Sequence, residues 1–136
     1  MYLLRKLRNF GVSQRILQTV YRSLIESILT FNMSVWYGIL GRKELAMLAR
    51  IVNYANKITG IPQIPLSALY TSTVRKKALK ISNDETHPLS IHFKLLPSTR
   101  RYRVPKCKKC LLRKSFLPNA VSILNSFNIL NLALRL

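Results

Sequence analysis

Acidic residues are scarce in this sequence: its 136 residues include only four Asp and Glu, against 23 Lys and Arg. The carboxylates are Glu26, Glu44, Asp84 and Glu85. A two-metal site for phosphoryl or nucleotidyl transfer needs several carboxylates that converge on one point. One adjacent pair and two isolated Glu residues do not supply such a set. We therefore expect no catalytic residue and no enzymatic activity in this chain.

Cysteine is also rare, and the two residues present form a single CxxC pair, Cys107 and Cys110. A structural zinc site needs four ligands, so this pair supplies half of one. The two histidines, His87 and His92, do not follow the pair at the spacing used in zinc fingers. A thioredoxin-like redox motif would need a βαβ context, which the sequence lacks. We expect two reduced thiols, no metal site and no cofactor.

Long uninterrupted apolar segments are missing as well. Residues 27–41 carry no charge, but 15 residues fall short of the roughly 20 that a spanning helix requires. Residues 115–134 are long enough, yet they contain Pro118 and four Asn, whose amides are costly in hydrocarbon. The N-terminus reaches Arg5 too early for a signal peptide. We expect no membrane span and no secretion, with a tail anchor at 115–134 as the alternative, and both nucleus and cytoplasm stay open.

Positive charge dominates what is present, with a formal net charge of +19 and an isoelectric point near 10.9. Such a chain repels itself unless an anionic partner neutralises it, and nucleic-acid phosphate is the usual partner. An anionic membrane surface comes second, and a basic surface that is merely solvated is the plain alternative. We therefore expect RNA or DNA as the partner, bound through its phosphate backbone.

Two clusters contain the candidate nucleic-acid-binding residues. The first lies in a basic arm and comprises Arg100, Arg101, Tyr102, Arg103, Lys106, Lys108, Lys109, Arg113 and Lys114. The second lies on an expected helix and comprises Arg75, Lys76, Lys77 and Lys80. Arginine contacts phosphate and stacks on bases, and Tyr102 offers a ring on which a base can stack. A polybasic localisation signal has the same composition, and the two interpretations are not exclusive.

The apolar pattern predicts an all-α chain of about four to five helices with a long irregular basic arm. We expect helices over 3–10 (ended by Gly11), from Ser13 as N-cap through 29, over 43–59 (ended by Gly60), over 67–82, and from about Pro118. This divides the chain into a helical bundle segment (1–83), a basic loop or arm (84–117), and a C-terminal helix with a divergent tail (118–136).

The clearest helical pattern is an apolar stripe with spacing i, i+1, i+4, i+5. Its members are Ile16, Leu17, Val20, Tyr21, Leu24, Ile25, Ile28 and Leu29. We expect this whole stripe to face the core, with Leu24 at its centre. If so, Leu24→Ala would destabilise the fold by about 2–5 kcal/mol.

Short blocks of sequence follow one another along most of the chain. They occupy residues 4–13, 21–31, 36–38, 48–53, 74–79, 87–89, 95–98, 100–105 and 114–118. In this order they resemble the C-terminal end of fish non-LTR (LINE-type) retrotransposon polyproteins, after the reverse-transcriptase palm. The resemblance covers about residues 2–126, and the tail from residue 127 diverges from it.

This resemblance implies a thumb-side helical segment that packs beside a reverse-transcriptase palm and helps to hold template RNA or target DNA. The resemblance also implies that the chain is a fragment of a larger protein, and this parent protein would be an RNA-directed DNA polymerase. Because the catalytic carboxylates are absent here, the resemblance implies a non-catalytic, nucleic-acid-binding remnant.

Residues 3–38 are also similar to the segment catalogued as the N-terminal domain of the AlkB-homologue-eight tRNA-modifying protein. That similarity would imply association with an iron and 2-oxoglutarate dioxygenase joined to a methyltransferase. The sequence contains no HxD motif and no glycine-rich loop for a methyl donor. A third interpretation is a structural module whose apolar helices are covered by a protein partner.

The cysteine pair leads to a first prediction. Protein purified without added metal should contain far less than one zinc per chain by elemental analysis, because two thiolates make half a tetrahedral site. The matched control is the variant with both Cys107→Ser and Cys110→Ser. Stoichiometric zinc in the natural chain that disappears in this variant would contradict the prediction.

Overall fold

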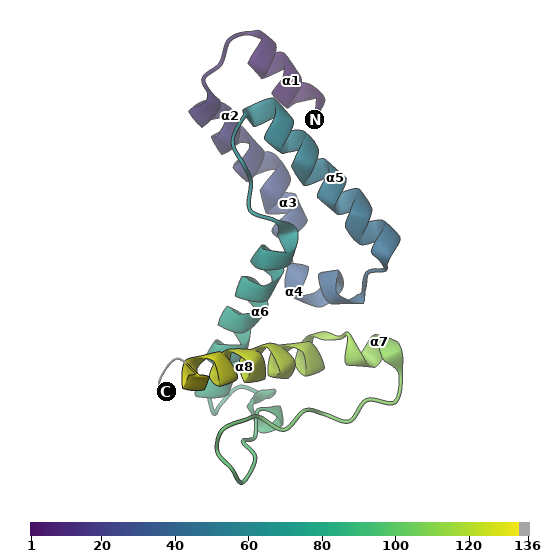
Figure 1. Ribbon diagram of the computed structural model, residues 1–136, viewed down its shortest axis with the longest axis vertical. Coiled ribbons are helices and arrows are strands. Elements are labelled where there is room, and N and C mark those ends of the chain that lie inside the picture. Colours follow the sequence, from purple (N-terminus) through teal and green to yellow (C-terminus); the bar gives the residue numbers. More distant parts are fainter. Residues whose placement is uncertain (134–136) are drawn as a thin grey trace. The chain divides into compact units, whose positions relative to one another are not determined.

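A computed structural model describes the backbone of residues 1–133 and the side chains of residues 1–127. Its helices are α1 (Tyr2–Asn9), α2 (Gln14–Val20), α3 (Ser27–Thr30), α4 (Met33–Trp36), α5 (Arg42–Thr59), α6 (Leu66–Asn83), α7 (Cys110–Arg113) and α8 (Phe116–Ala133) (Figure 1). A π-helical stretch (Tyr21–Glu26) joins α2 to α3, and 3-10 turns occupy Tyr37–Ile39 and Ser90–His92. The all-α fold class is confirmed, and the helices beyond the expected four to five are short.

The chain divides into two compact units. The first contains Met1–Met33 and Leu40–Tyr70, and the second contains Ser34–Ile39 and the described residues from Thr71 onward. The division falls inside α6, whereas the sequence pattern predicts a single segment over 1–83.

Residues 134–136, the end of the expected divergent tail, lie outside the described residues. Among the described residues, no helix combines the length and apolar character needed to cross a membrane.

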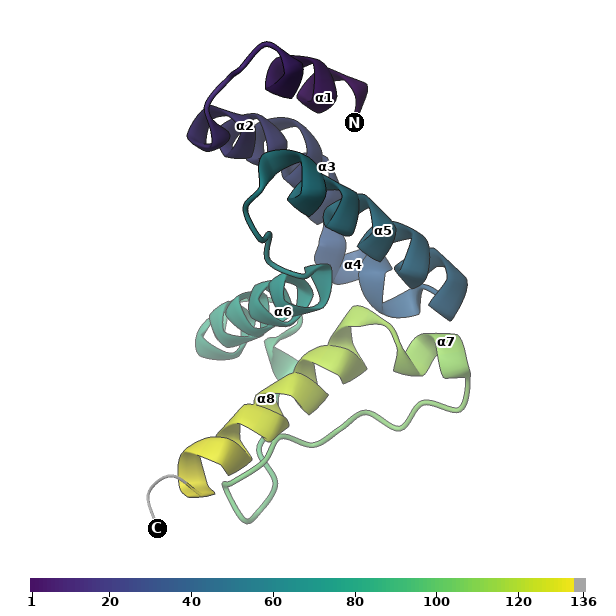
Figure 2. The same cartoon turned by 45° about the horizontal axis from the view of Figure 1, so that its top comes forward.

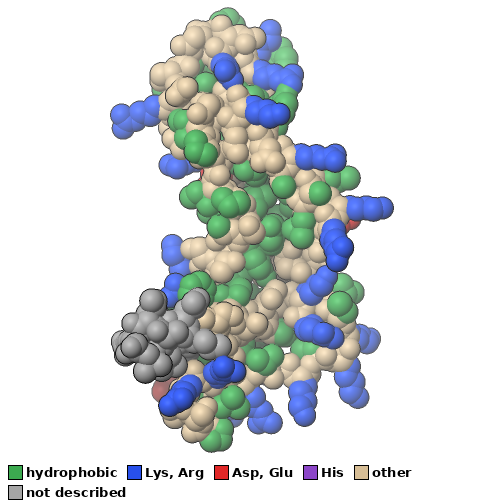
Figure 3. All heavy atoms as spheres, in the orientation of Figure 1, with side chains coloured by type: hydrophobic (Ala, Val, Ile, Leu, Met, Phe, Trp, Pro, Cys, Tyr) green, Lys and Arg blue, Asp and Glu red, His purple; other side chains and the backbone are tan. Residues whose placement is uncertain are grey.

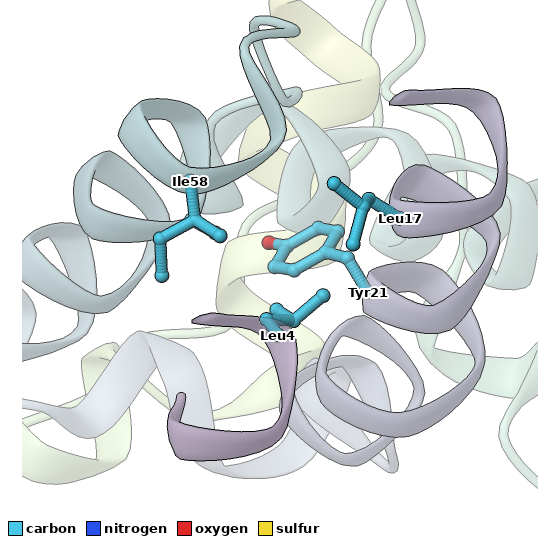
Figure 4. Packing of buried hydrophobic residues seen from close by; sticks show 5 residues of the cluster. Leu4, Leu17, Tyr21 and Ile58 are labelled. Carbon is cyan, nitrogen blue, oxygen red and sulfur yellow. The ribbon is translucent and has the colours of Figure 1, made fainter. Parts of the chain in front are cut away.

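The core of the first unit forms where α1, α2 and α5 meet. Leu4, Leu17, Tyr21, Ala55 and Ile58 are all buried there, and Figure 4 shows three aliphatic side chains around the Tyr21 ring. Burial, with a smaller effect from the charge of Glu26, raises the pKa of the Tyr21 hydroxyl above its usual value. The ring therefore stays neutral and acts as a large apolar side chain at the centre of this core.

Two glycines end helices in the first unit, as the sequence predicts. Gly11 (φ 74°) follows α1 and Gly60 (φ 69°) follows α5, and both adopt the left-handed conformation that glycine accepts without strain. The guanidinium of Arg8 donates hydrogen bonds to the carbonyls of Lys57 and Ile58 in the last turn of α5. These carbonyls have no partner within the helix, so Arg8 both caps α5 and connects α1 to it.

The expected N-cap of α2 is only partly observed. Ser13 occupies the position before Gln14, but its side chain makes no capping hydrogen bond. Serine is favoured at this position because its side chain can accept a backbone N–H, and that contact is missing.

The prediction that the whole apolar stripe is buried is wrong. Leu17 and Tyr21 are buried, but Leu24 is 49% exposed and Ile28 is 74% exposed. The π-helical stretch explains the change, because i→i+5 bonding widens the turn and moves later residues off the face that a 3.6-residue period defines. The Ser23 hydroxyl of this stretch donates to the Thr19 and Val20 carbonyls at the end of α2, which competes with regular helical bonding.

The buried apolar side chains of the second unit come from three parts of the chain. They are Val74, Ala78 and Ile81 of α6, Phe93 of the long loop between α6 and α7, and Ala120, Val121 and Leu124 of α8. Figure 2 shows this loop running alongside α8 before it reaches α7. Helix α8 begins at Phe116, two residues before the expected Pro118, which fits because proline is tolerated in the first turn.

The burial pattern of the stripe gives a second prediction. Leu17→Ala should lower the free energy of unfolding by about 2–5 kcal/mol, because it leaves a cavity beside the Tyr21 ring. Leu24→Ala should lower it by about 1 kcal/mol or less, because half of that side chain is already in water. Denaturant unfolding followed by circular dichroism measures both values. Equal losses for the two variants would contradict the observed burial.

Candidate nucleic-acid interface

The basic arm is not irregular throughout, because residues 94–103 fold back on themselves as a short hairpin-like loop. Leu95 and Tyr102 form an antiparallel bridge. The Leu96 N–H donates to the Arg101 carbonyl and the Arg103 N–H donates to the Lys94 carbonyl, both at 2.8 Å. We call residues 94–103 the basic hairpin. Pro97 lies in the turn of this loop, where the bridge does not need the N–H that proline lacks.

A side chain of α8 holds the second strand of the basic hairpin. The Tyr102 N–H donates to Asn125 Oδ1 at 2.7 Å, and Asn125 Nδ2 donates to the Tyr102 carbonyl at 3.0 Å. The amide of Asn125 therefore takes the place of a neighbouring strand. In the sequence, Asn125 stands out only as an obstacle to membrane insertion. Asn125 lies 23 residues after Tyr102, which is too far along the chain for a local sequence pattern to predict that the two residues pair.

The ring of Tyr102 packs against another aromatic ring. It meets the buried Phe93 ring edge to face, with centroids 6.2 Å apart and planes at 83°. Such aromatic pairs add stability beyond the area that they bury. Tyr102 is half-buried, so this contact and the Asn125 pair anchor the basic hairpin. A base that stacks on Tyr102, as the sequence predicts, would contact a ring that already packs against Phe93.

The two strands of the basic hairpin place positive charges on one face. The two backbone hydrogen bonds set Lys94 directly opposite Arg103. Because successive side chains alternate between faces, this face lies opposite the one that carries Leu95 and Tyr102. Like charges directly opposite each other in an antiparallel pair are destabilising. An anion bound between them would relieve this repulsion.

A groove of about 480 Å³ adjoins this pair. Its lining includes His92, Lys94, Arg103 and Lys106, together with three apolar residues, and no carboxylate is among them. We call it the cationic groove. Two ammonium groups, a guanidinium and an imidazole line it, and phosphate groups are the natural ligands of such a surface.

The remaining residues of the arm cluster are exposed. Arg100 and Arg101 lie at and beside the turn of the basic hairpin, and Arg113 and Lys114 lie at the end of α7. Lys106, Lys108 and Lys109 line a second shallow groove with Leu111 and Leu112. Figure 3 shows Lys and Arg side chains extending from the surface with few Asp or Glu among them. All the predicted arm cations are therefore accessible to a partner.

The second predicted cluster, on α6, does not form one surface. The Arg75 guanidinium lies over the Phe127 ring, 4.1 Å from its centroid. Lys77 Nζ donates to Ser34 Oγ at 2.8 Å, and Lys80 lines a pocket with Lys77, whereas Lys76 is exposed. Consecutive residues of a helix point in different directions, which separates a cluster that is compact in sequence.

The cysteine pair lies where α7 begins. Cys107 is half-buried and Cys110 is exposed, and both are free thiols. Within the described part of the chain, no group of three or more His, Cys, Asp and Glu residues is placed to hold a metal ion.

A third prediction concerns the anchor of the basic hairpin. Asn125→Ala should lower the free energy of unfolding of the second unit by about 1–3 kcal/mol, because it leaves two backbone groups of Tyr102 without their partner. The Tyr102 amide should then exchange hydrogen markedly faster, as measured by NMR. Asn125→Asp keeps the acceptor for this amide and should protect it better than alanine. Ser126→Ala, at an exposed neighbour, is the control, and a similar effect there would contradict the assigned role.

Comparison of the chain with protein-family models, with curated proteins and with solved structures gives no match in any of the three. Its own residues and their geometry are therefore the basis for assigning it a function.

Proposed function

We propose that this protein binds nucleic acid through the phosphate backbone and performs no catalysis of its own. The observation that carries the proposal is the cationic groove, where Lys94 and Arg103 are held directly opposite each other and no carboxylate offsets them. Backbone hydrogen bonds and the Asn125 anchor keep these charges close despite their repulsion. A phosphate between them gains attraction to both and removes the repulsion.

The binding mode follows from the type of contact. Lys and Arg on an exposed loop reach phosphate oxygens, and such contacts position a protein on nucleic acid without reading its sequence. Arg100 and Arg101 extend the same charged surface toward the hairpin turn. We propose low sequence specificity and an affinity that falls steeply with salt, because each phosphate contact releases counterions.

The resemblance to non-LTR retrotransposon polyproteins gives this activity a biological setting. In a reverse transcriptase, a basic segment after the palm would hold template RNA or target DNA near the polymerase site. We propose that role for residues 2–126, with the polymerase carboxylates supplied by the palm. The four carboxylates of this chain contribute none of that chemistry.

A second candidate function is supported by the first unit. Apolar side chains of the α2–α3 region are exposed, among them Ile16, Leu24, Ile28 and Phe31, and Phe10 after α1 is 80% exposed. Exposed apolar side chains mark a protein interface where they form a contiguous patch. A protein-interaction module is therefore the alternative, and the basic hairpin would then be an accessory feature.

The fourth prediction tests phosphate binding. Fluorescence anisotropy with a single-stranded RNA should give a straight line of log affinity against log salt. The triple variant Arg100→Gln, Arg101→Gln, Arg103→Gln should reduce the magnitude of that slope by about two to three, since each lost contact removes about 0.7–0.9. The matched control replaces Arg42, Lys43 and Arg50 of α5 with Gln, which removes the same charge from exposed positions in the first unit.

Two results would contradict the proposal. An equal slope change in both triple variants would mean that net charge, and not the basic hairpin, determines binding. The absence of binding at low salt would leave the apolar surface of the first unit as the better candidate. The fold of each variant is checked by circular dichroism, and exposed arginines can be replaced with little effect on stability.

A further inference from the structure

A separate cavity of about 360 Å³ lies in the second unit. Its lining contains two lysines from one face of α6, Lys77 and Lys80, which are three residues apart. Lys77 Nζ donates to the hydroxyl of Ser34, a side chain that is 2% exposed. This bond fixes one ammonium at the wall of the cavity and leaves two of its three N–H donors for a ligand. The cavity shares no residue with the cationic groove, so a ligand bound in it is independent of the proposed function.

The loop after α6 forms a second wall of the cavity. Hydrogen bonds within this loop hold its side chains in place before a ligand binds. His87 Nδ1 accepts the Leu89 N–H at 3.1 Å, so the neutral ring carries its proton on Nε2 and offers a donor there. Asp84 Oδ1 accepts the N–H and the hydroxyl of Thr86, at 3.0 and 2.6 Å. These two bonds from Thr86 are the main cause that holds the pKa of Asp84 below its usual range. Asp84 is therefore an ionised acceptor at the rim of a cavity lined by donors.

The third wall is apolar. Phe116, in the first turn of α8, lines the cavity together with Ile81 and Leu89. An aromatic ring beside two aliphatic side chains suits a flat, largely apolar group. The cavity also lies in the size range of small-molecule sites, which is about 300–1,000 Å³.

We propose that this cavity binds one ribonucleotide. The phosphate lies against the ammonium groups of Lys77 and Lys80 and the Nε2–H of His87, since these three residues are the basic members of its lining. The base packs on Phe116. Asp84 repels phosphate and can only accept hydrogen bonds, so it faces the ribose hydroxyls. The nucleotide can be a free monophosphate or the phosphorylated end of an RNA strand, because both present the same groups.

Isothermal titration of the full chain with adenosine 5′-monophosphate tests this site. One equivalent should bind, and adenosine and inorganic phosphate should each bind at least about tenfold more weakly, because each lacks one half of the contacts. The 2′-deoxy monophosphate should also bind more weakly, since it lacks a hydroxyl for Asp84. Equal binding of inorganic phosphate and the nucleotide would overturn the proposal.

Two variants distinguish nucleotide binding in this cavity from the general attraction of an anion to a basic protein. Lys80→Gln should weaken nucleotide binding by roughly tenfold, because a charged hydrogen bond to phosphate is lost. Lys76→Gln removes the same charge from the same helix at a position that does not line the cavity, and it should have no effect. Equal losses in the two variants would overturn the proposal. Lys80 is preferred to Lys77 as the test because replacing Lys77 would also leave the buried Ser34 hydroxyl without its partner.

A last comparison distinguishes the two sources of the nucleotide. At a salt concentration that suppresses backbone binding, a 5′-phosphorylated oligoribonucleotide is compared with its 5′-hydroxyl form. A preference for the phosphorylated form that disappears in Lys80→Gln identifies a strand end. Binding of the monophosphate without such a preference identifies a free nucleotide. Lys80 lines the cavity and not the cationic groove, so the effect of Lys80→Gln on monophosphate binding reports on the cavity alone. This inference and the proposed function can therefore fail separately.

Discussion

The shortage of carboxylates is the constraint on which the rest of the structure depends. With 23 cations and four acids, most positive side chains have to be placed without an ion pair. Arg8 is placed by helix-end carbonyls, Arg5 by the face of the Tyr54 ring at 4.7 Å, and Lys77 by the Ser34 hydroxyl. Carbonyls, rings and hydroxyls position a cation without cancelling its net charge. The chain can thus be ordered and still present its charge to an anionic partner.

The basic hairpin is also held in place by uncharged groups, although the repulsion between its own positive charges opposes its folding. Lys94 and Arg103 repel each other across the strands, and neutral contacts on the other side compensate. Asn125 pairs with the backbone of Tyr102, and the Tyr102 ring packs on Phe93. Groups held in place before binding lose less freedom when the ligand arrives. The energy that anchors the loop therefore favours binding of the phosphate backbone proposed for it.

The two units differ in what they offer a partner. The first has a small core around Tyr21 and leaves much of its apolar stripe in water, because the π-helical stretch turns Leu24 and Ile28 away from that core. The second has grooves and a cavity lined by cations.

The sequence by itself determined the features that depend on neighbouring residues. The all-α class follows from helical periodicity, and the helix ends at Gly11 and Gly60 follow from a backbone conformation that glycine adopts readily. The excess of cations, and the arm that concentrates them, are properties of composition. These signals act over a few residues or over the whole chain, so no tertiary structure is needed to recognise them.

Only the tertiary structure decided which of these residues act together. It paired Asn125 with Tyr102 across 23 residues and Lys77 with Ser34 across 43, and it divided the α6 cluster that looked continuous in sequence. It also decided which part of the apolar stripe is buried. Hydrogen bonds and packing between distant segments depend on how helices and loops are arranged in space, and local residue preferences carry no information about that arrangement.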